Sequence, residues 1–260
     1  MLAGSKIKFK KIIIADDFGF NYKNDNAMLS LLSDKKIDGV SIFSEYVSSK
    51  SIEELLELKE KKNIKIGLHF NLTLTQSKNK KINVKYLLLK SFFNIIDKVS
   101  VANDFENQLN LFIKKLGFYP DFIDGHEHVH AFPIISNVIY KKLKAINYEG
   151  LVRYVGSGST DLFMRSLKYN FFSKYITLEI IAITQKTLLK KNNLKFNKSF
   201  DGLLPDKKSK NLKKILNEIY KPSNSRQLLI MCHPGSRHSS RSNFFQSSDR
   251  AFETNYLSKL

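Results

Sequence analysis

The sequence has no tryptophan and only one cysteine, Cys232, among its 260 residues. A single cysteine excludes an internal disulfide framework and is typical of a reducing compartment, so a cytoplasmic location is expected. No apolar run reaches the roughly 18–20 residues that a membrane-spanning helix needs. The short basic start is not followed by the apolar core of a signal peptide. These absences argue against a secreted disulfide scaffold and against an integral membrane protein.

Acidic residues are scarce relative to basic ones. The chain has 24 Asp and Glu against 43 Lys and Arg, and its formal net charge is +19. Such a balance suits polyanionic partners. The lysines fall in short pairs along the whole chain, however, and no nucleic-acid-binding signature accompanies them. We therefore expect a lysine-rich solvated surface and no nucleic-acid partner, while peripheral contact with an anionic membrane surface and oligomerisation stay open.

Short apolar segments alternate with helix-like segments along the chain. We predict strands at residues 11–15, 39–43, 65–71, 122–126, 151–154, 199–203 and 228–232. Helices are predicted at residues 24–32, 51–62, 103–116, 134–146, 208–220 and 249–260, with one or two more between 162 and 189. This alternation favours a parallel α/β architecture, and the length suits a single α/β barrel. We therefore predict one domain, residues 1–260, with a TIM-like (β/α) barrel fold and a helical insertion at residues 155–198.

Polar side chains with catalytic potential follow the ends of the predicted strands. They are Asp16, Asp17, His69, Asp124, His126, Arg153 and His233. The carboxyl ends of the strands of a parallel barrel meet at one face. We therefore expect these side chains to share one site.

The densest of these clusters is the segment from Asp124 to His130. It holds three of the six histidines at alternate positions, in phase with Asp124. Alternate side chains of an extended segment lie on the same face, so an extended backbone would present Asp124, His126, His128 and His130 together. Imidazole and carboxylate groups are ligands for zinc and similar divalent ions. The segment therefore predicts a metal site.

Asp17, His69 and His126 are the preferred ligands. Two neutral imidazoles and one carboxylate would leave a coordination position open for water or substrate. Asp16 is then placed to take a proton from the attacking water, and His233 to protonate a leaving amine. These roles together predict hydrolysis of an amide or an ester.

Several of these roles have alternatives. Asp16 could be the ligand in place of Asp17, and His128 in place of His126. His128 and His130 could instead face the substrate. Arg153 could bind a substrate oxygen or neutralise the carboxylates at the barrel mouth. Asn71, two residues after His69, is a further candidate for substrate contact.

Four segments resemble the YdjC-like family. They are residues 15–19 (Ala-Asp-Asp-Phe-Gly), 67–73 (Gly-Leu-His-Phe-Asn-Leu-Thr), 124–130 (Asp-Gly-His-Glu-His-Val-His) and 231–235 (Met-Cys-His-Pro-Gly). Each is weak alone, but four in this order across most of the chain are specific.

The resemblance implies a barrel related to the polysaccharide deacetylases and metal-dependent removal of acetyl groups from N-acetylated sugars. It also implies that Asp17, His69 and His126 hold one divalent ion, with zinc or magnesium preferred. Asp16 would be the base and His233 the acid. Members of the family usually continue into a final strand that this chain lacks, so we expect seven strands or incomplete closure. Residues 155–198 match no family pattern, and we expect them to set the choice of sugar, whether oligosaccharide, polysaccharide or lipid-linked glycan.

Two other functions remain alternatives on the same face. A metal-dependent phosphoesterase would need more ligands and two metals about 3.5–4 Å apart. A non-catalytic protein that binds glycans or polyanions would need neither the base nor the acid.

Overall fold

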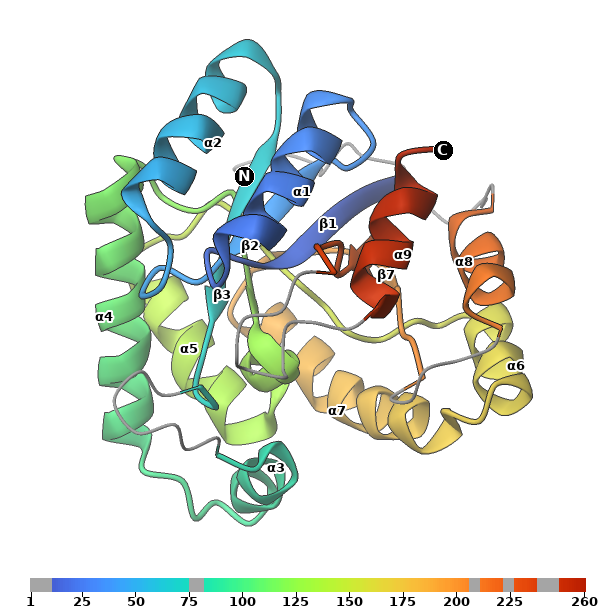
Figure 1. Ribbon diagram of the computed structural model, residues 1–260. Helices are drawn as coiled ribbons and strands as arrows, with labels where there is room; N and C mark the ends of the chain where they lie inside the picture. Colours follow the sequence, from blue (N-terminus) through green and yellow to red (C-terminus); the bar gives the residue numbers. More distant parts are fainter. Residues whose placement is uncertain (1–10, 75–81, 206–210, 222–226, 238–247) are drawn as a thin grey trace, which may run out of the picture.

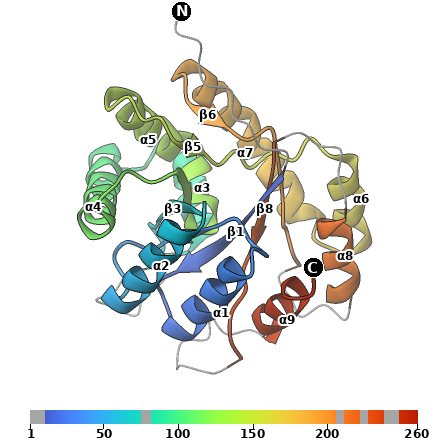
Figure 2. The same ribbon diagram turned by 90° about the horizontal axis from the view of Figure 1, so that it is seen from above.

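The computed structural model describes residues 11–74, 82–205, 211–221, 227–237 and 248–260. Its centre is a sheet of eight parallel strands in the order β6-β5-β4-β3-β2-β1-β8-β7. The strands are β1 (Lys11–Phe18), β2 (Gly39–Ile42), β3 (Lys65–Phe70), β4 (Phe122–Gly125), β5 (Leu151–Val152), β6 (Lys195–Phe196), β7 (Ser199–Asp201) and β8 (Leu228–Cys232). The sheet curls, with helices on its outer side (Figures 1 and 2), and this confirms the predicted TIM-like α/β fold.

The two edge strands of the sheet, β6 and β7, are consecutive parts of one extended segment. β6 pairs with β5 and β7 pairs with β8, and only Asn197 and Lys198 separate the two strands. The buried Asn197 side chain accepts from Tyr154 N at 2.7 Å and donates to Tyr154 O at 2.9 Å. An amide side chain thus extends the hydrogen bonding beyond β5 where the segment turns from one neighbour to the other. The labelled strands therefore occupy seven positions around the curl, and no strand follows β8 within residues 233–237 and 248–260.

The described helices are α1 (Tyr22–Ser33), α2 (Ser49–Lys61), α3 (Val84–Phe92), α4 (Lys98–Leu116), α5 (Pro133–Ala145), α6 (Thr160–Lys168), α7 (Phe172–Lys191), α8 (Leu212–Tyr220) and α9 (Ser248–Leu257). Their ends follow local chemistry. Gly117 ends α4 in the left-handed conformation with φ 83°, and Pro133 is the first residue of α5. Asn21 and Ser48 cap α1 and α2, which each begin two residues before the starts predicted at residues 24 and 51.

The core lies between the sheet and the surrounding helices. Parallel strands are covered on both faces and are therefore apolar throughout. All five residues of β8 are buried, as are Ile13 and Ile14 of β1. The helices α6 and α7 occupy the segment where one or two helices were expected, and α3 forms where no helix was predicted. The first three residues of the helix predicted at 208–220 lie outside the described residues. Within the described parts of the chain, no helix combines the length and apolar character that crossing a bilayer requires.

Candidate active site

A bulge at the end of β1 turns two consecutive carboxylates toward the same space. Neighbouring side chains of a regular strand point to opposite faces. The pairing of β1 with β2 shifts between Ala15 and Phe18, and Asp17 adopts the left-handed conformation with φ 67°. Asp16 and Asp17 consequently both line one cavity. Backbone strain of this kind is concentrated at functional sites, and aspartate tolerates it better than most residues.

His69 is oriented by the neighbouring strand. The register of β3 with β4 sets His69 opposite Asp124. His69 Nδ1 donates to Asp124 Oδ1 at 2.6 Å, and Ser41 Oγ lies 3.0 Å from the same nitrogen. His69 Nε2 then faces Asp17 Oδ1 at 3.3 Å. A carboxylate that holds one imidazole nitrogen while the other faces a shared centre is the usual arrangement behind a metal-binding histidine.

The strand predicted at residues 122–126 ends at Gly125, so the extended backbone that would align Asp124, His126, His128 and His130 does not form. The chain instead forms a 3-10 helix, η1 (His126–Ala131), in which Glu127 and His128 both have left-handed backbone angles. The alternation therefore breaks, and the histidines point to different places. His126 Nδ1 lies 3.0 Å from Asp17 Oδ1, whereas His128 packs edge-on against Phe200.

The fourth member of that predicted face, His130, lies away from the cavity. It is fully buried, and its Nε2 lies 2.9 Å from the carbonyl oxygen of Arg153. It therefore tethers η1 to the chain after β5.

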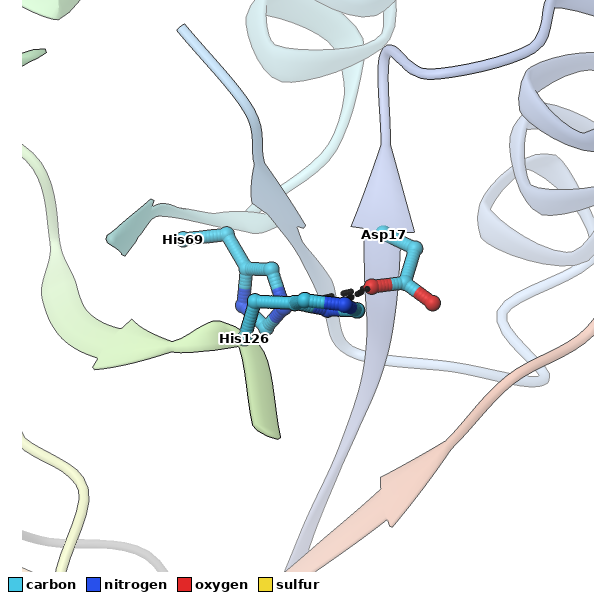
Figure 3. A group of neighbouring side chains, drawn as sticks. All are labelled: Asp17, His69 and His126. Carbon is cyan, nitrogen blue, oxygen red and sulfur yellow. Dashed lines mark hydrogen bonds and ion pairs between the residues drawn. The ribbon is translucent and has the colours of Figure 1, made fainter. Parts of the chain in front are cut away.

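Asp17, His69 and His126 meet at one point (Figure 3). Each offers a ligand atom, and these atoms all lie within 4.8 Å of one another. Two imidazoles and a carboxylate, buried or nearly so, form a donor set that suits zinc and related divalent ions. The predicted ligand residues therefore fit a mononuclear centre.

Asp16, His69 and Asp124 form a second group with ligand atoms equally close. Here, however, Arg153 already compensates both carboxylates. Its guanidinium donates to Asp16 at 2.6 and 2.7 Å and lies 2.6 Å from Asp124 Oδ2. A buried cation in this position disfavours a second metal ion.

The two aspartates around Arg153 differ in their titration. Burial raises the pKa of the Asp16 carboxyl, although Arg153 opposes this effect. Burial would also raise the pKa of Asp124, but Arg153 and His69 hold that pKa below its usual value. The two carboxylates that contact Arg153 thus differ in pKa, and Asp16 is the better proton acceptor.

His233 follows β8 and lines the same cavity. Its backbone N–H donates to Glu253 Oε2 at 2.8 Å, which ties the strand end to α9. Burial lowers the pKa of His233 to about 3 despite the nearby Asp17 carboxylate. The ring is therefore neutral near pH 7 and has to gain a proton during turnover if it is to act as an acid.

Arg250 of α9 is a site residue that sequence reasoning missed. Its guanidinium pairs with Asp17 Oδ2, on the oxygen not used by the two histidines. After burial, which acts in the opposite direction, Arg250 is the main cause that holds the pKa of Asp17 well below its usual value. No motif surrounds this arginine, so only its place in the first turn of a helix could have drawn attention to it.

The cavity over these side chains has a volume of about 610 Å³. Its walls come from β1, β3, β4, α3, η1, α7, β8 and α9, and α7 contributes Ser173, Lys174, Thr177, Leu178 and Ile181. Helix α7 is anchored by buried Gln185, which donates to the carbonyl oxygen of Arg153 at 2.8 Å. The predicted insertion thus forms one wall of the cavity.

Three residues predicted to contact substrate are not among the described residues that line this cavity. They are Arg153, His130 and Asn71. The Asn71 side chain instead closes the turn after β3, accepting from Thr73 N and Leu74 N and donating to Leu74 O. Their positions favour roles in supporting the site over contact with substrate. For Arg153, this is the role of neutralising the carboxylates at the barrel mouth.

Another cavity, of about 660 Å³, lies at the amino-terminal ends of the strands. Its lining includes Ile12, Lys65, Phe122 and Leu151, where four strands begin. Barrel enzymes place their chemistry at the opposite, carboxyl-terminal face. The cavity above Asp17 is therefore the candidate active site.

Metal affinity is expected to rise with pH. Burial favours a neutral His69, but Asp124 raises its pKa to about 10 in the ion-free protein. A ligand nitrogen must be unprotonated, so binding a cation releases this proton, and we expect about a tenfold gain in affinity per pH unit near neutrality. Calorimetric titration with zinc at two pH values measures this gain.

The Asp124→Asn variant is the control for that measurement. Without the carboxylate, the pKa of His69 should fall and the pH dependence should weaken, whereas the affinity corrected for the released proton is expected to fall by about 10–100-fold as the imidazole loses its orientation. An affinity for the unaltered protein that does not change with pH would contradict the role given to His69.

The fold and the site together define a TIM-like α/β protein with a candidate metal centre at the carboxyl ends of its strands. The sequence matches the family described as YdjC-like protein over residues 10–259, so the chain belongs to the YdjC-like family. The family resemblance carried by the four sequence segments is thereby confirmed.

Among the proteins similar to this chain are two curated deacetylases of carbohydrates and one solved structure. The carbohydrate deacetylase of Homo sapiens is 27% identical over 155 residues, covering 54% of this chain and 47% of that protein. The chitooligosaccharide deacetylase of Proteus mirabilis (strain HI4320) is 27% identical over 153 residues, covering 54% of this chain and 59% of that protein. The chain therefore spans about half the length of the curated relatives it matches.

The solved structure is from Enterococcus faecalis V583 and is named as a candidate cellobiose-phosphate cleavage protein. It aligns with a TM-score of 0.59 at 20% identity, over 96% of this chain and 91% of that one. This likeness supports the fold.

Proposed function

We propose that this protein is a hydrolase that removes acetyl groups from an N-acetylated sugar and depends on one divalent metal ion. The observation that carries the proposal is the meeting of Asp17, His69 and His126 under a cavity, beside the buried carboxylate of Asp16. The similarity to curated deacetylases of carbohydrates supports the reaction class.

The residues divide the chemistry between them. Asp17, His69 and His126 would hold the ion, with zinc or magnesium preferred, and the ion would polarise the acetamide carbonyl and lower the pKa of a water molecule. Asp16, whose pKa is raised by burial, would take the proton from the attacking water. His233 would pass a proton to the leaving amine, which gives acetate and a free amino sugar.

The cavity wall suits a sugar ring. Phe132, Leu178, Ile181 and Met231 provide apolar surface, and Thr177 adds a hydroxyl group. We therefore propose that α7 selects the sugar. The prediction that residues 1–260 form a single domain, and the cytoplasmic location expected from Cys232, stay predictions.

The phosphoesterase alternative loses support because Arg153 occupies the second group of potential ligands. Measurement of acetate release distinguishes a catalyst from the non-catalytic alternative.

Acetate release from a panel of N-acetylated oligosaccharides tests the proposal. We expect a chelator to stop the release, and zinc, magnesium or a related ion to restore it, because the polarised carbonyl and the activated water both require the cation. A coupled assay for acetate measures the rate, and heat-denatured protein serves as the blank. Metal-loaded protein that releases no acetate from any member of the panel would contradict the assignment.

A further inference from the structure

Helix α3 exposes apolar side chains although it borders the cavity. Leu89 is 54% exposed and Phe92 is 44% exposed, and Phe93 at the end of the helix is 69% exposed. Within α3 itself only Ser91 is fully buried. Contiguous apolar surface on a helix of this kind marks an interaction site.

Helix α7 carries a second exposed apolar stripe. Ile176, Ile180 and Ile183 are 41%, 50% and 71% exposed. Their spacing of three and four residues sets them on one side of the helix, away from the buried Leu178 and Gln185. The stripe begins near a cluster in which Phe163, Phe172 and Tyr175 lie ring to ring.

Both surfaces lie at the end of the molecule that holds the candidate active site. Leu88 of α3 and Thr177 of α7 line the cavity, and the two helices lie at the lower end of the molecule in Figure 1. We call these exposed residues the apolar rim. It consists of Tyr86, Leu89, Phe92, Phe93 and Ile95 together with Phe172, Ile176, Ile180 and Ile183.

Lysines are interleaved with the apolar rim, and acidic groups beside it are already engaged. Residues 82–100 and 172–191 contain several lysines, whereas their only acidic residues are Asp97 and Glu179. Asp97 accepts from Val99 N and Ser100 N, and Glu179 accepts from Ser157 N at 2.8 Å. The surface therefore presents apolar groups and positive charge together.

We propose that the apolar rim docks on an anionic lipid bilayer, with the apolar side chains at the level of the headgroups and the lysines on the lipid phosphates. Interfacial binding requires this combination of exposed Phe, Leu and Ile with lysine. A second copy of the chain is a poorer occupant, because two chains with a net charge of +19 repel each other. The docking does not depend on the proposed catalytic function.

Sedimentation of the full chain with lipid vesicles tests the docking. We expect binding at low salt to vesicles of phosphatidylcholine mixed with phosphatidylserine, and none to phosphatidylcholine alone. The double variant Phe93→Ser/Ile183→Ser should bind about tenfold more weakly, because it removes two apolar groups from the interface. Lys90→Gln should weaken binding about fivefold.

The matched control is Tyr119→Ser/Ile146→Ser. These residues are 57% and 44% exposed, but they line the cavity at the opposite end of the strands. We expect this variant to bind as the unaltered chain does, and thermal unfolding to show that every variant is folded. The proposal is overturned by an absence of binding to the anionic vesicles, by equal losses in the two double variants, or by a concentration-dependent dimer that Phe93→Ser/Ile183→Ser abolishes.

Discussion

Replacing Asp16 by asparagine is expected to lower kcat for acetate release by about 10²–10⁴-fold, the usual contribution of a general base. The amide has nearly the same shape but cannot take a proton from water. Binding of the metal ion should persist, because Asp17, His69 and His126 are unchanged and supply the ligands. Acetate release and calorimetric titration with zinc, done on the same preparation, separate the two effects.

Asp34→Asn is the control for that variant. Asp34 lies at the end of α1 on the exposed surface, so its loss of charge should leave turnover and metal binding unchanged. If the protein only binds its ligand and catalyses nothing, neither Asp16→Asn nor Asp34→Asn should cause a functional loss. Turnover by Asp16→Asn near that of the unaltered protein would remove Asp16 from the mechanism.

Replacing Arg153 by methionine is expected to lower the free energy of unfolding by about 3–5 kcal/mol, since removing one partner of a buried ion pair leaves its charge uncompensated. Arg153 is completely buried and forms ion pairs with both Asp16 and Asp124. The loss should shrink as the pH falls, because the two buried carboxyl groups of the variant would become protonated in the folded state. Urea denaturation near pH 7 and near pH 5 measures both effects.

Two further substitutions define the origin of the loss. Lys61→Met removes an exposed cation from α2 and should change stability little. Arg153→Lys keeps the charge but not the two parallel hydrogen bonds to Asp16, so it should recover only part of the stability. An Arg153→Met protein as stable as the unaltered chain would show that the carboxylates are not held by this cation.

The order of strands and helices could be predicted because local chemistry determines it. Three consecutive isoleucines follow Lys11 in β1, Gly117 ends α4 and Pro133 starts α5. The candidate ligands could be located for a related reason, since residues at the carboxyl ends of parallel strands converge whatever their spacing in the chain. Strand β6 escaped prediction because its two residues lie within the segment 155–198 that was predicted as a helical insertion.

The directions in which the histidine side chains of η1 point could not be predicted. Glutamate does not signal a left-handed angle, and histidine, although enriched there, adopts it in only a minority of cases, yet Glu127 and His128 both do so. The surrounding structure decides the backbone here, because the ring of His130 is held by the carbonyl oxygen of Arg153, which directly follows β5. The same reason applies to Arg250, whose partner Asp17 is 233 residues away in the chain. Contacts of that range leave no local signature.

The attachment of α9 to the first strand has a consequence for biosynthesis. Arg250 holds Asp17, and Glu253 holds the backbone of His233, so the ribosome must translate the codons for both before the centre is complete. A nascent chain that has exposed only β1 to β7 carries all three candidate ligands but neither of these contacts. The contacts that position Asp17 and the backbone of His233 therefore form only after α9 has left the ribosome, although the three candidate ligands are synthesised earlier.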